Sequence, residues 1–223
     1  MRLMKAFALC LLLPAAGFAA KHAKAPPAGP KPLEEGEYAR VLKVAGPVSI
    51  RALGHQGFMP GDTGASLIPG DELKTGPGGI AQVELGDGVV LVVGGRSDVV
   101  LGGEADDALM QFKLGEWLLG VFHELPKGRS LRVATPQAVA AVRGTLCWGK
   151  TDPRETQVAA IEHEVEVTAA GKTITLKPGQ LSRIPSGQPP ASPVAFAVPA
   201  ETVDRLRIEG SLGGLEGLFP KPK

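Results

Sequence analysis

Cysteine is almost absent from this sequence of 223 residues. Only two occur, and we expect Cys10 to be lost with an N-terminal export signal. Cys147 then stands alone, so no intramolecular disulfide can form, even in an oxidising compartment. Between apolar neighbours, Cys147 is typical of a small buried hydrophobe. A reactive thiol would need a cation closer than Arg143. Stability must come from a hydrophobic core, and about 200 residues suffice for one sizeable domain.

An excess of charge of either sign is also missing. The chain carries 24 Lys and Arg against 23 Asp and Glu, and loss of Arg2 and Lys5 with the signal leaves 22 against 23. A nucleic-acid-binding protein would show a basic patch or stripe. The near neutrality therefore argues against nucleic acid as a partner.

Long apolar runs are lacking as well. A membrane-spanning helix needs ~20 apolar residues, and the run at residues 6–13 is shorter. Positive residues precede this run, Pro14 ends it, and Gly17-Phe18-Ala19 places small residues at a cleavage position, which indicates a signal peptide over residues 1–20. We expect a periplasmic or secreted protein, with no transmembrane segment after signal removal.

Compact catalytic and metal-binding clusters are not found either. No histidine pair has the i, i+4 spacing of a helical metal site, and no pair of cysteines remains once Cys10 is lost with the signal. No serine lies in the pattern of a nucleophile elbow, and no glycine-rich turn opens a helix that could cradle phosphate. We therefore expect no catalytic residues, no metal and no cofactor. The four dispersed histidines are His22, His55, His123 and His163.

One acidic set has two interpretations. Glu162, Glu164 and Glu166 alternate, so they point to one face of a strand and are most simply a solvated face. A calcium site is the alternative, although no loop has the Asp-rich spacing that it needs.

What the sequence does contain is a succession of short strands with turn signals every ~10 residues, which predicts an all-β fold: a single domain forming a two-layer sandwich or short β-roll. The apolar run 89–93 predicts a buried central strand, and Gly-Asp-Gly at 86–88 predicts a tight hairpin turn between it and residues 80–85. Residues 146–150 and 156–161 predict a second hairpin, with its turn at 152–154. Residues 112–122 predict two short strands joined at Gly115-Glu116, because glycines there argue against a helix. Residues 54–65 predict a loop. Pro-rich linkers flank the domain at both ends.

These patterns divide the chain into four parts. A signal peptide covers residues 1–20 and a linker rich in Pro, Ala and Lys covers 21–37. The β domain covers 38–185. A C-terminal segment rich in Pro and Gly covers 186–223, with one short helix expected at residues 199–209.

The most informative run is Thr-Pro-Gln-Ala-Val-Ala-Ala-Val-Arg-Gly-Thr at residues 135–145. Thr135 and Pro136 predict the start of a strand, since proline is tolerated at a strand's first residue. Both alternating sets of side chains that follow are small or apolar, which favours burial on both faces. Arg143 then stands alone, and Gly144 permits a bend.

This run resembles the signature Thr-Pro-x-Ala-x-x-x-Val-Arg-Gly-Thr of the periplasmic domain of the FecR family. Residues 46–50 resemble its opening strand, 69–76 its Gly-Asp-x-Leu-x-Thr-Gly block, and 81–88 its strand with an Asp-Gly turn; together the blocks extend over about residues 41–185. We assign a structural role to the motif residues Gly70, Asp71, Thr75, Gly76, Asp87, Gly88, Thr135, Pro136, Arg143, Gly144 and Thr145.

Arg143 itself has two interpretations. In the structural one, its planar fork pairs with a carboxylate or with loop carbonyls. In the functional one, it clamps the carboxylate of a ligand. The core-like residues around it favour the structural role.

The resemblance implies a recognition module outside the cytoplasm. FecR-type proteins are known as membrane-spanning regulators, with a cytoplasmic region that binds a sigma factor and a periplasmic domain that senses an outer-membrane transporter. Here only five residues precede the apolar segment, so we carry over the β domain and its recognition role, not the sigma-regulating activity. Residues 162–164, Glu-His-Glu, stand where the family often has Glu-Gly, which predicts one altered turn.

Three functions remain. We favour a non-catalytic binding or sensing module for an envelope protein or polymer. A structural or assembly component of the envelope is the alternative, and a hydrolase with a site built across loops is the third. A binding module could use a loop face or an exposed edge strand. We expect edges beside the acidic loop 102–107 and the turn 152–154, with residues 156–161 as a pairing edge.

We predict that export removes residues 1 to 19 or 20, because the positive, apolar and small-residue regions follow the order that a signal peptidase reads. N-terminal sequencing of protein recovered from the envelope fraction checks this. Mature protein that retains Met1, or that carries a lipid on Cys10, would contradict it.

Overall fold

The computed structural model describes residues 33, 38–86, 89–102, 109–121, 131–142, 146–199 and 203. By its internal contacts the chain divides into two compact units, residues 1–31 and 32–223. All described residues belong to the second unit. The predicted signal peptide and the predicted turn at Asp87 and Gly88 lie outside the described residues, and so do Arg143, Gly144 and Thr145.

The described residues are almost entirely β-structure, as the sequence predicts. The strands are β1 (Ala39–Ala45), β2 (Val48–Arg51), β3 (Met59–Pro60), β4 (Ser66–Leu67), β5 (Glu72–Thr75), β6 (Ile80–Glu84), β7 (Val89–Val93), β8 (Asp98–Leu101), β9 (Leu109–Val121), β10 (Leu131–Ala134), β11 (Val139–Val142), β12 (Leu146–Thr151), β13 (Glu155–Ala160), β14 (Val165–Ala169), β15 (Lys172–Leu176), β16 (Gln180–Pro185) and β17 (Val194–Ala195).

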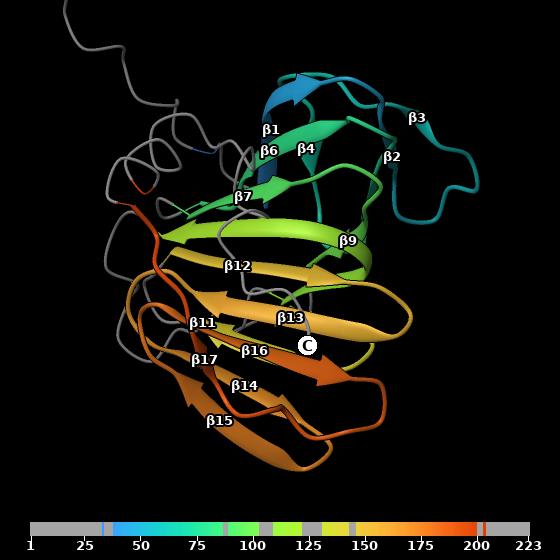
Figure 1. The fold of residues 1–223 in the computed structure, drawn as a ribbon. Coiled ribbons are helices and arrows are strands. Elements are labelled where there is room, and N and C mark those ends of the chain that lie inside the picture. Colours follow the sequence, from blue (N-terminus) through green and yellow to red (C-terminus); the bar gives the residue numbers. More distant parts are fainter. Residues whose placement is uncertain are drawn as a thin grey trace, which may run out of the picture. The chain divides into compact units, whose positions relative to one another are not determined.

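The strands form two layers that share β9 (Figure 1). In sheet A the order is β4-β1-β6-β7-β9-β12-β13-β16-β17, with the second half of β9. In sheet B it is β3-β2-β5-β8-β9-β10-β11-β14-β15, with the first half of β9. The β9–β10 pair is parallel, and the other pairs among the described strands are antiparallel. This confirms the predicted two-layer β fold.

Alternation along each strand builds the core between the layers. In β14 every second residue is buried, and the residues between them are exposed. That period of two is the spacing at which side chains share one face of a strand. The apolar run of β7 is buried almost throughout, with β6 and β9 on either side, so the predicted central strand is confirmed. The largest fully buried side chains include Trp117, Phe112, Leu73, Leu91, Leu101, Met110 and Leu119.

The prediction of two short strands over residues 112–122 is wrong, because β9 runs without a break. Gly115 takes a positive φ of 117°, and a Cβ at this position would overlap the side chain of Ser97. Gly115 lets β9 bend from sheet B into sheet A while the strand's hydrogen bonding continues. The glycine therefore bends one strand and does not separate two.

The loop predicted at residues 54–65 contains β3, which pairs with β2. Two expectations for the signature run are also wrong. Residues 135–138 form the turn between β10 and β11, so the strand begins at Val139. Val139 is 37 % exposed and Ala140 is buried, so β11 is buried on one face, because no described strand covers the outside of sheet B there.

The predicted hairpin between residues 146–150 and 156–161 is confirmed as β12 and β13. Its turn is closed by the Asp152 carboxylate, which accepts hydrogen bonds from the backbone N–H groups of Arg154 at 2.7 Å and Glu155 at 3.0 Å. Such a side-chain-to-backbone turn is characteristic of Asp. The predicted antiparallel pairing of residues 80–85 with residues 89–93 is confirmed as well, by β6 and β7.

The outer face of sheet A carries a second apolar cluster, formed by Val92, Leu118, Leu146, Trp148, Ala159, Ile161 and Leu181. The segment after β16 packs on it through Phe196 and Val198, which are two residues apart and so share a face. The Phe196 N–H also donates to the Gly179 carbonyl oxygen at 2.8 Å. Part of the predicted C-terminal segment is thus docked on the domain. The helix predicted at 199–209 lies outside the described residues except at Pro199 and Val203.

We predict that Gly149→Ala destabilises the fold, because a Cβ at Gly149 would overlap the indole ring of Trp117 in the core. Overpacking of this kind typically costs about 1–3 kcal/mol. Urea unfolding at equilibrium measures the change. Gly57→Ala is the matched control, since no atom lies within 4 Å of a Cβ there and its φ is not positive. Equal free energies of unfolding for the two variants would contradict the prediction.

Candidate functional site

Asp71, a motif residue, joins two loops to the start of β5. One carboxylate oxygen accepts a hydrogen bond from the Leu53 N–H at 2.8 Å, and the other accepts one from the Ile68 N–H at 3.0 Å. Asp71 itself is buried. Beside it, Gly70 has a φ of 97° and lies against the Leu53 side chain, which a Cβ would approach to 2.8 Å. The Gly-Asp pair therefore fixes two loop tips.

Thr75 and Gly76 hold the other end of β5. The buried Thr75 hydroxyl donates to the Gly94 carbonyl oxygen and accepts from the Ser97 N–H at 2.9 Å. The Gly76 N–H donates to the Pro47 carbonyl oxygen at 2.9 Å. Four motif residues thus fix the two ends of one short strand.

The start of the signature run lies in a buried hydroxyl network. The Thr135 hydroxyl bonds both to its own turn and to Thr156, at 3.0 and 2.9 Å. The side-chain amide oxygen of Gln137, Oε1, accepts from the hydroxyls of Thr151 and Thr156 at 3.0 and 2.7 Å. These contacts tie the β10–β11 turn in sheet B to the β12–β13 hairpin in sheet A. Pro136 is exposed at this turn.

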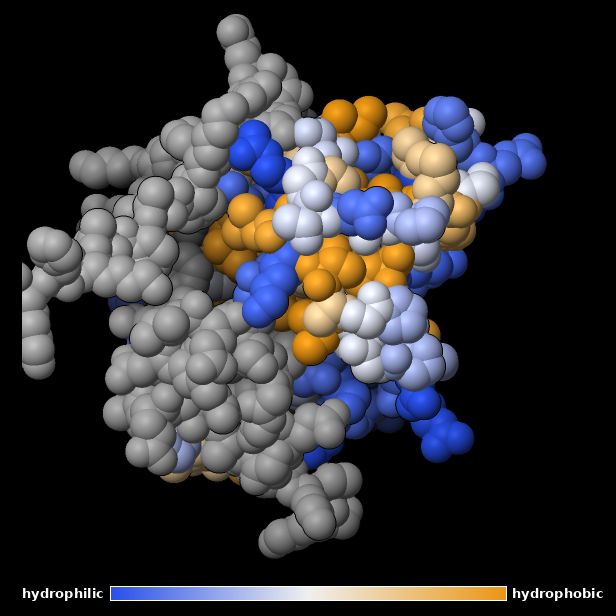
Figure 2. All heavy atoms as spheres, turned by 90° about the horizontal axis from the view of Figure 1, so that it is seen from above, coloured by the Kyte–Doolittle hydropathy of each residue, from blue (hydrophilic) through white to orange (hydrophobic). Residues whose placement is uncertain are grey.

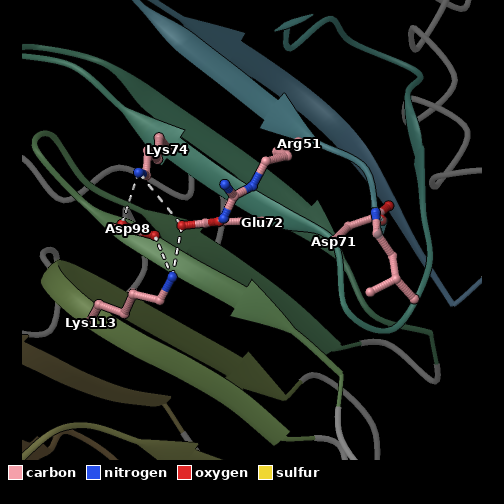
Figure 3. Close-up of polar contacts among 7 residues, drawn as sticks. Arg51, Asp71, Glu72, Lys74, Asp98 and Lys113 are labelled. Carbon is pink, nitrogen blue, oxygen red and sulfur yellow. Dashed lines mark hydrogen bonds and ion pairs between the residues drawn. The ribbon is translucent and has the colours of Figure 1, made fainter. Parts of the chain in front are cut away.

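A cluster of five charged side chains lies on the outer face of sheet B (Figure 3). Glu72 is at its centre: its carboxylate pairs with the Arg51 guanidinium, with Lys113 Nζ at 2.9 Å and with Lys74 Nζ at 3.6 Å. Asp98 pairs with Lys74 Nζ at 3.2 Å and Lys113 Nζ at 3.9 Å. The residues come from β2, β5, β8 and β9, and three cations surround two carboxylates. We call them the β5 charge cluster.

The Phe58 ring covers one side of the β5 charge cluster. The Arg51 Cζ lies 4.9 Å from the ring centroid and the Lys74 Nζ lies 4.5 Å from it. Both distances are within the range of cation–π attraction. The aromatic ring therefore helps to fix two of the three cations beside Glu72.

The two carboxyl groups of the cluster have pKa values shifted in opposite directions. Burial raises the pKa of Glu72, but its hydrogen bonds with Asp98 and Lys113 and the charges of Lys113 and Lys74 outweigh this effect and lower it to about 2. Burial and the hydrogen bond with Glu72 raise the pKa of Asp98, against the opposing contact with Lys74. The surroundings therefore favour the ionised form of Glu72 and disfavour the ionised form of Asp98.

Apolar side chains are exposed beside the cluster, on β3 and in the loops that follow β2 and β4. Leu53, Met59 and Ile68 are 60 %, 61 % and 48 % exposed. At the end of the domain that carries β1, β3 and β4, apolar surface alternates with polar surface (Figure 2). The Leu53 and Ile68 N–H groups both bond to Asp71, which directly precedes Glu72, so these apolar residues lie at the end of β5 that carries Glu72.

The predicted pairing edge is wrong. Residues 156–161 lie largely in β13, which has β12 on one side and β16 on the other. The strand before the acidic loop, β8, lies between β5 and β9. Edges depend on the order of strands in space, and local sequence does not specify that order. Among the described strands, the outermost are β4 and β17 in sheet A and β3 and β15 in sheet B.

The remaining predicted positions lie apart from these surfaces. Cys147 is fully buried, and burial raises the pKa of its thiol, so the prediction of a buried hydrophobe is confirmed. Glu164 and Glu166 are exposed and Glu162 is half-buried. Within the described ranges no group of three or more His, Cys, Asp or Glu side chains could hold a metal ion. No helix in the same ranges has the length and hydrophobicity of a membrane span.

Sequence reasoning did not identify the β5 charge cluster. The alternation in β5 does indicate that Glu72 and Lys74 share the face opposite Leu73. The convergence of Arg51, Asp98 and Lys113 on them depends on the register of β2, β8 and β9, and no local pattern carries that register.

The resemblance to the FecR family is confirmed by comparison with known proteins. The family model described as FecR protein matches residues 71–166. Asp71 and the signature run lie within the match, whereas the predicted opening strand at residues 46–50 lies outside it. No curated protein matches the chain.

Two solved structures resemble the domain, and both are candidate anti-sigma factors from Parabacteroides distasonis ATCC 8503. The first has a TM-score of 0.50 at 21 % identity and covers 60 % of this chain and 63 % of its own. The second has a TM-score of 0.49 at 20 % identity and covers 62 % and 74 %. The chain thus spans less than two thirds of the first structure, and at this identity the likeness shows the fold alone.

We predict that Glu72 makes stability depend on pH. Its folded-state pKa is lowered to about 2, so its contribution is present above the ordinary pKa of 4.5 and is lost as the pH falls toward 2. Asp98, with a raised pKa, acts in the opposite direction and reduces the slope. We expect a net loss of roughly 1–3 kcal/mol. Glu72→Gln should flatten this dependence in urea unfolding from pH 5 to 2, and an unchanged profile would contradict the assignment.

Proposed function

We propose that this protein is a non-catalytic binding or sensing module outside the cytoplasm, in the periplasm or secreted, and that it recognises a protein of the cell envelope. The match to the FecR family supports a sensing or regulatory role. The observation that carries the proposed mode of binding is the edge of sheet B at β15, which pairs with β14 on one side and with no described strand on the other.

The turn before β15 fixes which backbone groups face outward. Ala170 and Gly171 both have positive φ, 45° and 74°, as in a two-residue hairpin of type I′. Ala169 and Lys172 flank the turn as partners, and the first pair beside such a turn is hydrogen-bonded, after which the pairs alternate. The N–H and C=O groups of Thr173 and Thr175 therefore point away from β14.

The side chains of β15 suit an edge that accepts one extended segment. Thr173 and Thr175 are exposed and β-branched, which favours extended backbone. Lys172 and Lys177, at the two ends, are exposed as well, and lysines at an edge suppress pairing between copies of a protein. A partner segment can add a strand through main-chain hydrogen bonds, and carboxylates at its ends would complement the two lysines.

We predict that Thr175→Pro abolishes partner binding with little loss of stability. Proline removes an outward N–H that the β14 ladder does not use, and proline is tolerated on edge strands. Thr175→Ala keeps the N–H and is the matched control. Ile174→Pro should instead unfold the edge, because its N–H faces β14.

The measurement is chemical cross-linking of the mature protein in envelope extracts, with thermal melts of each variant. The expected result is one cross-linked partner that wild type and Thr175→Ala capture and Thr175→Pro does not. Equal capture by the folded proline variant would show that β15 is not the docking edge. Turnover of a glycan or peptide by the purified protein would overturn the non-catalytic function as a whole.

A further inference from the structure

The loop tips beside the β5 charge cluster present a second surface, distinct from β15. Leu53 and Ile68 are large apolar side chains more than 45 % exposed. Their backbone N–H groups bond to the two oxygens of one carboxylate, that of Asp71. The backbone therefore holds these two residues close together. Their side chains remain exposed, although removing apolar surface from water would be favourable.

The position of these tips is fixed, which distinguishes them from loosely placed loop residues. Asp71 is 4 % exposed, its N–H donates to the Ile68 carbonyl oxygen at 3.1 Å, and its own carbonyl oxygen accepts from the Leu101 N–H at 2.9 Å. A buried carboxylate is costly unless its oxygens accept hydrogen bonds, and here each oxygen accepts one from a backbone N–H. Here that feature has the effect of presenting Leu53 and Ile68 to solvent.

The β5 charge cluster next to the tips exposes its cations more than its carboxylates. The side chains of Lys74 and Lys113 are 41 % and 53 % exposed, whereas those of Glu72 and Asp98 are 4 % and 19 % exposed. Each ammonium group has three donors, so a carboxylate of a partner can bind to them from solvent.

Spacing relates the apolar and the charged parts. Leu53 lies two residues beyond Arg51, in the turn that follows β2, where the His55 N–H donates to the Ala52 carbonyl oxygen at 3.0 Å. Two residues of chain span at most about 7 Å. A segment lying over this end of β2 would therefore meet an apolar contact and a cation within about 7 Å, the reach from residue i to residue i+2 of an extended peptide.

We propose that Leu53, Ile68 and the β5 charge cluster form a docking surface for an extended protein segment that carries an aliphatic side chain and, two residues away, a carboxylate. Exposed apolar side chains rimmed by polar groups are typical of protein interaction sites, and the exposed ammonium groups of Lys74 and Lys113 select an acidic neighbour over a basic one. This inference rests on the proposed function that the module binds a protein, but it uses different residues from β15.

The test uses the mature chain labelled with 15N and capped six-residue peptides as probes. One peptide contains Leu-Thr-Glu, a second Leu-Thr-Lys and a third Ser-Thr-Glu. In NMR titrations, we expect the first peptide to shift the amide signals near Leu53, Ile68 and Lys74 in a saturable way, and to bind at least about tenfold more tightly than the other two, as the loss of one apolar or one charged contact implies.

Variants locate the effect on the surface. The double variant Leu53→Ser with Ile68→Ser should lose binding without a change in stability, because both side chains are largely exposed. Val139→Ser is the matched control, since Val139 is 37 % exposed on another part of sheet B. Lys113→Glu should reverse the preference between the Glu and Lys peptides.

Two results would overturn the inference: equal affinity for the Leu-Thr-Glu and Leu-Thr-Lys peptides, or unchanged affinity in the Leu53→Ser, Ile68→Ser variant. Thr175→Pro should leave the peptide titration as in wild type. Loss of partner capture in that variant therefore tests β15 alone, and a failure at one surface is distinguishable from a failure at the other.

Discussion

The passage of β9 from one layer to the other is the constraint on which the rest of the structure depends. Its first half pairs with β8 and β10 in sheet B, and its second half pairs with β7 and β12 in sheet A. The corner lies at Gly115, where the side chain of Ser97 fills the space that a Cβ would need. The Ser97 hydroxyl accepts a hydrogen bond from the Glu116 N–H at 3.1 Å. Because one strand belongs to both sheets, the spacing of the layers and the registers on either side are set together.

The two outer faces of this framework differ in chemistry. Sheet A carries an apolar outer cluster around Trp148, on which Phe196 and Val198 pack, so part of the chain's own C-terminal segment shields that face. Sheet B instead exposes charged residues around Glu72. Charges with partners tolerate solvent, and the sheet needs no covering segment where they lie. The two proposed contacts rest on the β15 edge and on the loop tips beside the β5 charge cluster, and both β15 and β5 belong to sheet B.

Sequence reasoning identified what is local and missed what depends on long-range pairing. The central strand β7 and the β12–β13 hairpin follow from apolar runs and turn residues over fewer than about twenty positions. Residues 156–161 were misjudged as an edge because the neighbour of β13 on its far side, β16, is distant in sequence. The β5 charge cluster was missed for the same reason, since four strands must be in register before Arg51, Asp98 and Lys113 meet Glu72. Glycine within a strand pattern predicts a break, yet Gly115 bends a strand that continues through it.

The turn at residues 162–164 shows how strongly the framework acts on local conformation. The FecR family often has Glu-Gly at this place, so His163 predicts an altered turn. His163 takes a φ of 53°, which glycine adopts freely and which costs an L-residue roughly 1–2 kcal/mol. The turn connects β13 in sheet A to β14 in sheet B, and both strands are fixed by their own partners. The Ile161 and Glu162 N–H groups also bond to the Leu146 carbonyl oxygen, at 2.9 and 3.1 Å. The paired strands therefore impose the backbone path, and the side chain at position 163 accommodates it.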